Sequence, residues 1–463
     1  MNVNETIVGQ LRAIVGKEHV LTSDLDRFGY SYDSSPVPLT PPNKPEVVVR
    51  PRTVEEVSQV MKIAYANGIF VTPRGASSGR SGGSVPLQGG IVLTLDRMTD
   101  ILELDEKNMM VTTEAGVRTM DLYNFCAQKG LFYPPDPASW KYSLIGGNVA
   151  ENAGGMRAVK YGVTSNYVMG LEVVLANGDI IHTGGKSIKN VTGYNLTQLM
   201  VGSEGTLGIV TKAILRLIPM PAKRGVMQVF FRSLDDGCAA VHTMLQRNIV
   251  PSAAELIDDV SLDAVARQKK TPFDPAAKAC LILEIDGPDE ASLKLQSDAI
   301  GQVVAEHQAV SFRVAQSQAE TDELWAIRRG LSSAVAATAP NRLGEDISVP
   351  RDAFPEAVRR LKEISRRKGL PIAVFGHAGD GNLHPSVLCD LSDPAQEKLA
   401  HEVVGEIFDA ALAVGGTLSG EHGIGITKRP YIYKALGEAG VAALKAVKQA
   451  MDPKGILNPG KIW

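Results

Sequence analysis

Two histidines, His377 and His384, flank a short glycine-rich stretch, His-Ala-Gly-Asp-Gly-Asn-Leu-His. Asp380-Gly381 is typical of a two-residue hairpin turn, in which both central residues need a positive φ. A turn there would place His377 directly opposite His384, and opposed residues of an antiparallel pair lie about 5 Å apart at Cβ. We therefore expect the two imidazoles to bind one ion together. The alternative is a pair of surface histidines in a glycine-rich loop.

A second glycine-rich stretch, residues 415–425, carries Glu421 and His422 side by side. Two histidines and one carboxylate are a common ligand set for a divalent metal that keeps open positions. We therefore predict that His377, His384 and Glu421 hold such a metal, with zinc, manganese, iron and cobalt all suited to these ligands. His422 then remains for proton transfer, because the pKa of an ordinary imidazole lies near neutrality.

The composition is that of an ordinary globular protein. The chain has 463 residues, of which 44% are hydrophobic and 21% charged, and its formal net charge is −3. This length predicts two or three domains, and the charge gives no basic surface for nucleic acid. The four cysteines are scattered without a C-x-x-C pair, which argues against an iron–sulfur cluster in this chain. The scattered cysteines also suit a reducing cytoplasm, where we expect the protein. No stretch approaches the roughly 20 apolar residues that span a bilayer, and peripheral attachment through a partner is left open.

Two stretches nearer the N-terminus indicate a nucleotide site. In the first, Arg74–Ser84, glycine and serine let successive backbone N–H groups approach phosphate closely. A predicted strand at 90–95 follows it instead of the helix that a Rossmann motif requires. The second, from Tyr133 to Gly162, is rich in small and amide residues, which suits a wall against a flat, hydrogen-bonding ring system. A flexible loop is the alternative for the first stretch.

The pattern of predicted elements changes after Pro219-Met-Pro221. Four strands and two helices alternate between 226 and 314, which indicates an α+β, ferredoxin-like sheet. A long helix over 320–338 then carries Arg328. A guanidinium matches a carboxylate in two hydrogen bonds, so Arg328 is the candidate clamp for a substrate carboxylate. A solvated helix arginine is the alternative.

Seven ordered motifs, spread over nearly the whole chain, resemble a known family. They are Arg74-Gly-Ala-Ser-Ser-Gly, Pro134-Pro-Asp-Pro, Gly146–Gly155, Gly202–Gly208, Gly376–His384, Gly420-Glu-His-Gly423 and Asn458-Pro-Gly-Lys461. The chain is similar to the FAD-linked oxidases of the vanillyl-alcohol-oxidase (PCMH-type FAD) fold. Within them it resembles the group of D-lactate dehydrogenases, D-2-hydroxyglutarate dehydrogenases and glycolate oxidase flavoprotein subunits.

The resemblance implies an α+β fold of three parts. These are a two-subdomain PCMH-type FAD-binding domain over 1–219 with a lead-in over 1–42, a cap domain over 220–420, and a segment over 421–463 that packs back on the FAD domain. FAD should be non-covalent, because the Arg74–Ser84 loop has neither histidine nor cysteine. The implied FAD contacts are Arg74, Gly75, Ala76, Ser77, Ser78, Gly79, Gly82, Gly83, Ser84, Pro135, Asp136, Ser143, Gly146, Gly147, Asn148, Asn152, Ala153, Gly154, Gly155, Gly162, Glu204, Gly208, Ile209, Val210 and Asn458.

The resemblance also implies metal-assisted oxidation of a D-2-hydroxyacid, with His422 as the base and Arg328 as the clamp. D-2-Hydroxyglutarate dehydrogenases carry a lysine where this chain has Leu343-Gly344, and an asparagine at the position of Ser386. D-Lactate or glycolate is therefore the favoured substrate. Electrons would pass to an electron-transfer flavoprotein, an iron–sulfur subunit or a quinone-linked protein. A D-2-hydroxyglutarate dehydrogenase, the flavoprotein subunit of a larger complex and a non-catalytic FAD-binding subunit are the alternatives, and a homodimer is left open.

Overall fold

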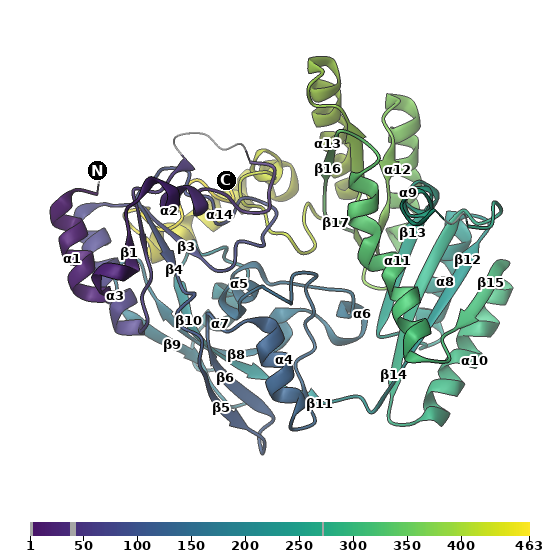
Figure 1. Ribbon diagram of the computed structural model, residues 1–463, viewed down its shortest axis with the longest axis horizontal. Coiled ribbons are helices and arrows are strands. Elements are labelled where there is room, and N and C mark those ends of the chain that lie inside the picture. The colour runs from purple at the N-terminus through teal and green to yellow at the C-terminus, as the bar shows by residue number, and fades with distance from the viewer. Residues whose placement is uncertain (1–2, 38–42, 271–272) are drawn as a thin grey trace. The chain divides into compact units, whose positions relative to one another are not determined.

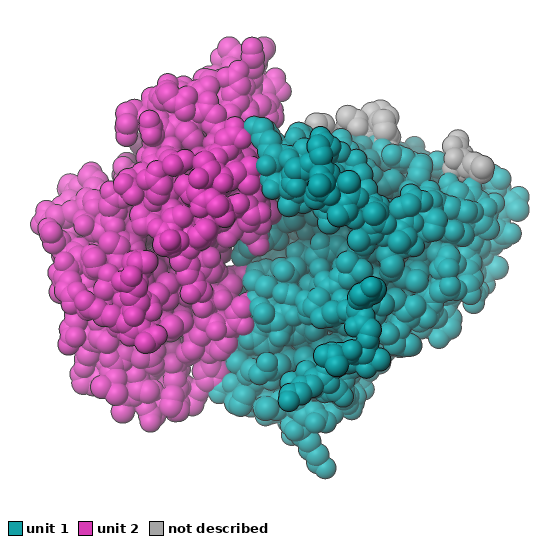
Figure 2. All heavy atoms as spheres, turned by 180° about the vertical axis from the view of Figure 1, so that it is seen from behind, with its two compact units in different colours: residues 1–154, 163–220, 421–463 teal, residues 155–162, 221–420 magenta. Residues whose placement is uncertain are grey.

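The computed structural model describes residues 3–37, 43–270 and 273–463. The chain divides into two compact units, which Figure 2 colours teal and magenta. Unit 1 comprises residues 1–154, 163–220 and 421–463, and unit 2 comprises residues 155–162 and 221–420. Residues 155–162, which the sequence assigned to the first domain, therefore belong to the second unit.

The first sheet of unit 1 has the strand order β1-β2-β4-β3, in which β2, β4 and β3 are parallel. Thr53 caps α3, accepting a hydrogen bond from the Glu56 N–H. Helices α1 and α3 bury apolar side chains against this sheet. The predicted lead-in over 1–42 is only partly covered, because 1–2 and 38–42 lie outside the described residues. The elements are α1 (Glu5–Val15), β1 (Val20–Leu21), α2 (Asp24–Gly29), β2 (Val47–Val49), α3 (Val54–Asn67), β3 (Val71–Arg74) and β4 (Ile91–Thr94).

The second sheet of unit 1 is antiparallel, with the order β5-β6-β10-β8-β9, and a two-stranded pair β11-β7 accompanies it. Helix α5 packs on β10, and a second apolar core lies beneath it. The elements are β5 (Ile101–Asp105), β6 (Met110–Glu114), α4 (Thr119–Ala127), β7 (Leu131–Phe132), α5 (Ile145–Glu151), β8 (Val168–Val174), β9 (Ile180–Gly184), α7 (Leu196–Met200), β10 (Ile209–Arg216) and β11 (Ile218–Pro219).

The last part of unit 1 is α14 (Ile432–Met451), which is kinked at Gly437, and the tail that follows it. Leu457 forms a parallel bridge with Val71, and the Asn458 N–H donates to the Val71 carbonyl at 2.7 Å. The tail thus extends the β2-β4-β3 sheet at the edge of β3, far from it in sequence.

Unit 2 is built on a seven-stranded sheet with the order β15-β12-β14-β13-β19-β20-β17 (Figure 1). The four neighbouring strands β15-β12-β14-β13 are antiparallel. Numbered in chain order, they have the arrangement 4-1-3-2 of the ferredoxin-like sheet that the sequence predicts. The strands are β12 (Lys223–Phe231), β13 (Ala253–Asp258), β14 (Ala279–Gly287), β15 (Ala309–Val314), β17 (Ile347–Ser348), β19 (Phe375–His377) and β20 (Asn382–Leu383).

Helices cover both faces of this sheet. Helices α8 and α10 pack on one face, and α9 and α11 pack on the other, around a core that includes Trp325 and Phe375. A three-stranded sheet, β16-β21-β18, and the neighbouring helices α12 and α13 complete the unit (Figure 1). The elements are α8 (Leu234–Gln246), α9 (Asp259–Lys269), α10 (Glu290–Glu306), α11 (Gln318–Ala336), β16 (Asn341–Gly344), α12 (Phe354–Lys368), β18 (Ile372–Ala373), β21 (Ser386–Cys389) and α13 (Pro394–Ala413). Among the described residues, no helix has the length and hydropathy needed to span a bilayer.

Residues 155–162, here named the clasp segment, leave unit 1 after Gly154, run through unit 2 and return to unit 1 at Val163. The segment contains the short helix α6 (Ala158–Tyr161). Its return is made at Gly162, whose φ of 79° favours glycine. Val159 packs on Gly379, where a Cβ atom would approach a Val159 methyl group to 2.5 Å.

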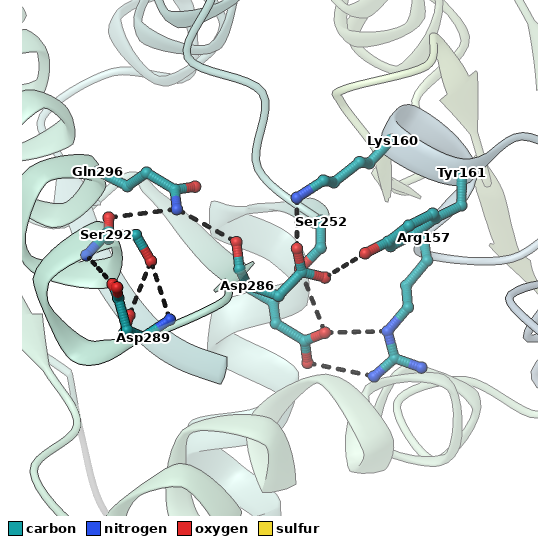
Figure 3. Close-up of polar contacts among 9 residues, drawn as sticks. Arg157, Lys160, Tyr161, Ser252, Asp286, Asp289, Ser292 and Gln296 are labelled. Atoms are coloured by element: carbon teal, nitrogen blue, oxygen red, sulfur yellow. Dashed lines mark hydrogen bonds and ion pairs between the residues drawn. The ribbon is translucent and has the colours of Figure 1, made fainter. Parts of the chain in front are cut away.

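Three side chains bind the clasp segment to two buried carboxylates of β14 (Figure 3). Arg157 donates to Glu284 from Nε at 2.9 Å and from Nη2 at 3.3 Å. Lys160 forms an ion pair with Asp286, which also accepts the Tyr161 hydroxyl at 2.7 Å. Residues two apart on a strand share one face, so a single face of β14 holds the whole segment.

Candidate functional site

A pocket in unit 1 is lined by three segments that the sequence singled out: the loop after β3, the start of α5, and the turn before β10. Glu421 and His422 also line it. The predicted cofactor contacts in its wall are Arg74, Gly75, Ala76, Ser77, Ser78, Gly79, Gly83, Ser84, Ser143, Gly146, Gly147, Asn148, Ala153, Gly154, Glu204, Gly208, Ile209 and Val210.

The absence of a side chain has different consequences at two of these glycines. At Gly146 a Cβ atom would lie 2.7 Å from the Ala115 Cβ, so α5 could not pack as closely. At Gly147 nothing lies within 4 Å of the Cβ position, so the missing side chain leaves the pocket open. A wall of backbone and small side chains is what a phosphate-bearing, planar cofactor needs. The residues present therefore fit FAD.

Arg74 lines the pocket, but its guanidinium is bound to the chain itself. It donates to the backbone carbonyls of Tyr32 at 2.9 Å and Tyr30 at 3.3 Å, and it lies over the Tyr30 ring. The donors that the loop after β3 presents to an anion are therefore mainly its backbone N–H groups. Ser77, with a φ of 57°, is the non-glycine residue of this loop whose backbone enters the left-handed region, and Gly82 has a φ of 86°.

A chain of polar side chains supports the start of α5. The Asn148 amide donates to the Thr119 hydroxyl at 2.8 Å, and Thr119 Oγ1 lies 2.9 Å from Ser143 Oγ. All three side chains are buried. Ser143 and Asn148 are thereby held in place on the wall of the pocket.

Two glutamates, of which Glu204 is buried and Glu151 is partly buried, lie against the loop that carries Glu421 and His422. The Glu204 carboxylate accepts the N–H groups of Ile424 at 2.8 Å and Gly425 at 2.7 Å. Burial raises the pKa of Glu204, against the effect of these donors. Burial and the neighbouring Glu204 raise the pKa of Glu151 well above its ordinary value. A pair of neighbouring acids therefore lies directly against the loop.

The other predicted cofactor contacts are not among the described residues that line the pocket. They are Gly82, Pro135, Asp136, Asn152, Gly155, Gly162 and Asn458. Asn458 acts on the walls indirectly, because its side-chain amide donates to the carbonyls of Gly83 at 2.9 Å and Glu204 at 2.7 Å. Gly155 and Gly162 bound the clasp segment of unit 2.

The predicted register of the histidine hairpin is wrong. Strand β19 pairs with β20 so that His377 faces Asn382, and the His384 N–H donates to the Phe375 carbonyl at 2.7 Å. The chain turns over residues 378–381, because β20 also pairs with β17 and this second partner sets its position.

The two imidazoles nevertheless meet. His384 lies diagonally across from His377, with the ring centroids 5.0 Å apart and the rings nearly perpendicular, and the two Nε2 atoms are 3.3 Å apart. Both side chains are buried. The alternative of two surface histidines is therefore excluded.

Each histidine has a buried carboxylate at its other ring nitrogen. His377 Nδ1 is hydrogen-bonded to Glu255 Oε1, and His384 Nδ1 lies 3.7 Å from Asp346 Oδ1. A carboxylate at Nδ1 favours a proton there and leaves Nε2 as a lone pair for a metal. Two nitrogens sharing a tetrahedral metal with bonds of about 2.0–2.1 Å lie roughly 3.3 Å apart. The arrangement in unit 2 thus fits a divalent ion.

Arg328 lies beside this pair and is only 15% exposed, which excludes the solvated helix arginine. Its Nε donates to Glu255 Oε2, and its guanidinium carbon lies 5.4 Å from the centre of the Phe375 ring. Burial alone would raise the pKa of Glu255, but the charges of His377 and Arg328 hold it below its ordinary value. Glu255 is therefore an anion shared by two partners.

A model of the C-terminal domain of FAD linked oxidases matches residues 220–462, and a model of an FAD binding domain matches residues 45–184. The chain belongs to the family of FAD-linked oxidases. This FAD-linked oxidase is 41% identical over 461 residues to the glycolate oxidase subunit GlcD of Bacillus subtilis (strain 168), covering 100% of this chain and 97% of that protein. It is 37% identical over 426 residues to a D-lactate dehydrogenase of Anaerostipes hadrus, covering 90% of each chain.

A solved structure of p-cresol methylhydroxylase with substrate bound matches 98% of this chain and 96% of that chain, with a TM-score of 0.80 at 20% identity. That likeness establishes the PCMH-type fold. The predictions of family, fold class and FAD-linked oxidoreductase activity are thus confirmed.

Sequence reasoning about this FAD-linked oxidase missed three carboxylates: Glu151, Glu255 and Asp346. Glu255 carried a usable signal, since it is a single acid within a short, otherwise apolar predicted strand that the structure buries completely. Asp346 stands in another predicted strand and is also fully buried, accepting hydrogen bonds from Asn382 and Ser419. Glu151 closes α5, and no local pattern marked it.

Proposed function

We propose that this FAD-linked oxidase oxidises a D-2-hydroxyacid, with D-lactate or glycolate favoured, to the 2-oxoacid and passes two electrons to an external acceptor. The observation that carries the proposal is the His377–His384 pair, with its Nε2 atoms 3.3 Å apart and a buried acid at each Nδ1. An FAD-binding scaffold with no hydroxyacid chemistry has no need of such a pair.

The proposal assigns the groups to residues of this chain. The pocket of unit 1 would hold FAD, and His377 and His384 would hold a divalent ion, with Glu421 as the third ligand. When bound, FAD supplies the acceptor for the Cα hydride, and the ion lowers the pKa of the substrate's 2-hydroxyl group.

Two residues of the chain act on the substrate. Arg328 binds the carboxylate of the substrate. Its Nε donates to Glu255, and this hydrogen bond fixes the orientation of the planar guanidinium, which can then bind a carboxylate. His422 accepts the hydroxyl proton as general base. The hydroxyl proton and the Cα hydride leave the substrate, and the C–O bond becomes the carbonyl of the 2-oxoacid.

The relatives support the substrate class. One is named as a glycolate oxidase subunit and another as a D-lactate dehydrogenase. One observation favours D-2-hydroxyglutarate as the second candidate. The Arg342 guanidinium lies 5.8 Å from the centre of the Phe375 ring and donates to Ser386 at 3.0 Å. A cation is therefore present next to Leu343-Gly344, where D-2-hydroxyglutarate dehydrogenases carry a lysine.

Two observations support an external acceptor. The four cysteines are free, buried and scattered, so they do not hold an iron–sulfur cluster together. The GlcD relative is named as a subunit, which supports a protein partner such as an electron-transfer flavoprotein, an iron–sulfur subunit or a quinone-linked protein.

The test is anaerobic mixing of the purified flavoprotein with D-lactate, L-lactate, glycolate and D-2-hydroxyglutarate, followed by flavin absorbance. We expect D-lactate or glycolate to bleach the flavin, chelation to stop the bleaching, and added metal to restore it. Bleaching by D-2-hydroxyglutarate alone would favour the second candidate. A flavin that none of the four acids reduces would contradict the proposal.

A further inference from the structure

Glu255 uses its two carboxylate oxygens for different partners. Oε1 is hydrogen-bonded to His377 Nδ1, and Oε2 accepts the Arg328 Nε–H. The side chain has no solvent exposure, so neither partner is replaced by bulk water.

The fold dictates this double contact. Glu255 and His377 are direct partners in the β13–β19 register, which brings their side chains together on one face of the sheet. Helix α11 covers that face and carries Arg328. One carboxylate is thus placed where a strand pair and a helix meet.

The carboxylate beside the other histidine has different partners. Asp346 accepts the Asn382 amide at 2.7 Å, the Ser419 hydroxyl at 2.9 Å and the Gly420 N–H at 3.1 Å. These contacts tie His384 to the backbone that leads into Glu421, and none of them involves the arginine. Glu255 therefore joins a histidine to the arginine, whereas Asp346 joins a histidine to the segment that precedes Glu421.

We propose that Glu255 is a positioning residue that couples metal binding to substrate binding. Oε1 fixes the tautomer and ring of His377 for the metal, and Oε2 fixes Arg328 for the substrate carboxylate. The inference rests on the proposed function. Because both groups depend on one carboxylate, a change at Glu255 weakens two affinities at once.

The test compares Glu255→Gln with two matched variants in the FAD-loaded protein. Gln can accept a hydrogen bond from only one of the two donors, since its other end is itself a donor. Asp346→Asn changes the acid of the other histidine. Glu284→Gln changes a buried glutamate on the same face of the sheet that binds Arg157, away from both histidines.

Two dissociation constants are measured. The first is for Zn²⁺ alone, by competition with a chromophoric chelator. The second is for oxamate, an inert carboxylate with an adjacent carbonyl, by its effect on the flavin spectrum at saturating Zn²⁺. We expect Glu255→Gln to weaken Zn²⁺ binding about 10- to 100-fold and to weaken oxamate binding as well. Asp346→Asn should weaken Zn²⁺ alone, and Glu284→Gln should change neither.

Unchanged Zn²⁺ affinity in Glu255→Gln, or equal behaviour of Glu255→Gln and Glu284→Gln, would overturn the inference. If Glu255→Gln does not fold, Arg328→Lys decides, because it must weaken Zn²⁺ binding severalfold through Glu255. Unaltered Zn²⁺ binding in that variant would also overturn the coupling. Both constants are read without turnover, so a protein that oxidises none of the four hydroxyacids would disprove the proposed function separately.

Discussion

The pocket of unit 1 and the histidine site of unit 2 differ in the chemical groups that form them. The pocket wall is mostly backbone, glycine, serine and alanine, and the guanidinium of Arg74 is turned to backbone carbonyls. The histidine site is a set of buried charges in which Glu255, Arg328 and His377 satisfy one another. A backbone wall tolerates little added volume, whereas a charge network tolerates no missing partner.

The largest effect should come from breaking the charge network at a ligand. His384→Asn should reduce hydroxyacid turnover by about 10³-fold, because metal polarisation is worth several kcal/mol. Metal analysis should show that the ion is lost while FAD remains bound. His401→Asn, an exposed histidine of α13, is the control and should behave as wild type. Loss of FAD in His384→Asn would contradict the assignment of FAD binding to the residues of unit 1.

The second test breaks a charge network that has no proposed chemistry. Arg157→Ala leaves Glu284 buried and unpaired, so we expect unit 2 to lose about 3–5 kcal/mol in urea unfolding. Lys160→Ala should cost less, because Asp286 keeps the Tyr161 hydroxyl at 2.7 Å, whereas Glu284 loses two guanidinium hydrogen bonds and keeps the Ser252 hydroxyl at 3.3 Å. Equal losses in the two variants would show that the clasp segment is held by packing instead.

The third test concerns a buried charge in unit 1. Burial lowers the pKa of Lys461 to about 8 from an ordinary 10.5. The unfolded lysine therefore binds its proton more tightly, and the lysine's contribution to stability rises with pH between about 8 and 10.5. The free energy of unfolding, compared with Lys461→Met, should increase by up to about 3 kcal/mol across that window. Exposed Lys454→Met should give a pH profile parallel to wild type.

The smallest effect should come from adding one methyl group to the backbone wall. Gly146→Ala places a Cβ atom 2.7 Å from Ala115, so we expect about 2 kcal/mol of destabilisation in thermal unfolding of the FAD-free protein. Gly147→Ala meets no atom within 4 Å and should keep that stability. It should instead lower FAD affinity by about tenfold, measured by fluorescence titration. The reverse order of stabilities would contradict the assignment of the two glycines.

The same contrast explains what the sequence could predict. A glycine in the sequence indicates a local property of the backbone. The Arg74–Ser84 loop and the Gly146-Gly147 wall could therefore be predicted from local patterns. His377 and His384 were visible as residue types, but their register depended on β17, which pairs with β20 from outside the hairpin.

The charge partners were harder to predict because they lie far apart in the chain. Glu255 is separated from His377 by 122 positions and from Arg328 by 73. The clasp segment binds to unit 2 through two carboxylates of β14 and through the packing of Val159 on Gly379, and all of these partners lie far from it in sequence. No local sequence pattern in the clasp segment or in β14 predicts such a pairing.

The course of the tail has a consequence for synthesis on the ribosome. The backbone that contacts Val71 and the amide that joins Gly83 to Glu204 are both provided by Leu457 and Asn458, which are translated after every residue of unit 2. The residues of unit 2, including the early clasp segment, have all been translated by position 420. Unit 2 can therefore fold while unit 1 still lacks the residues that pair with Val71, and the flavin pocket is completed only after Leu457 and Asn458 have been translated.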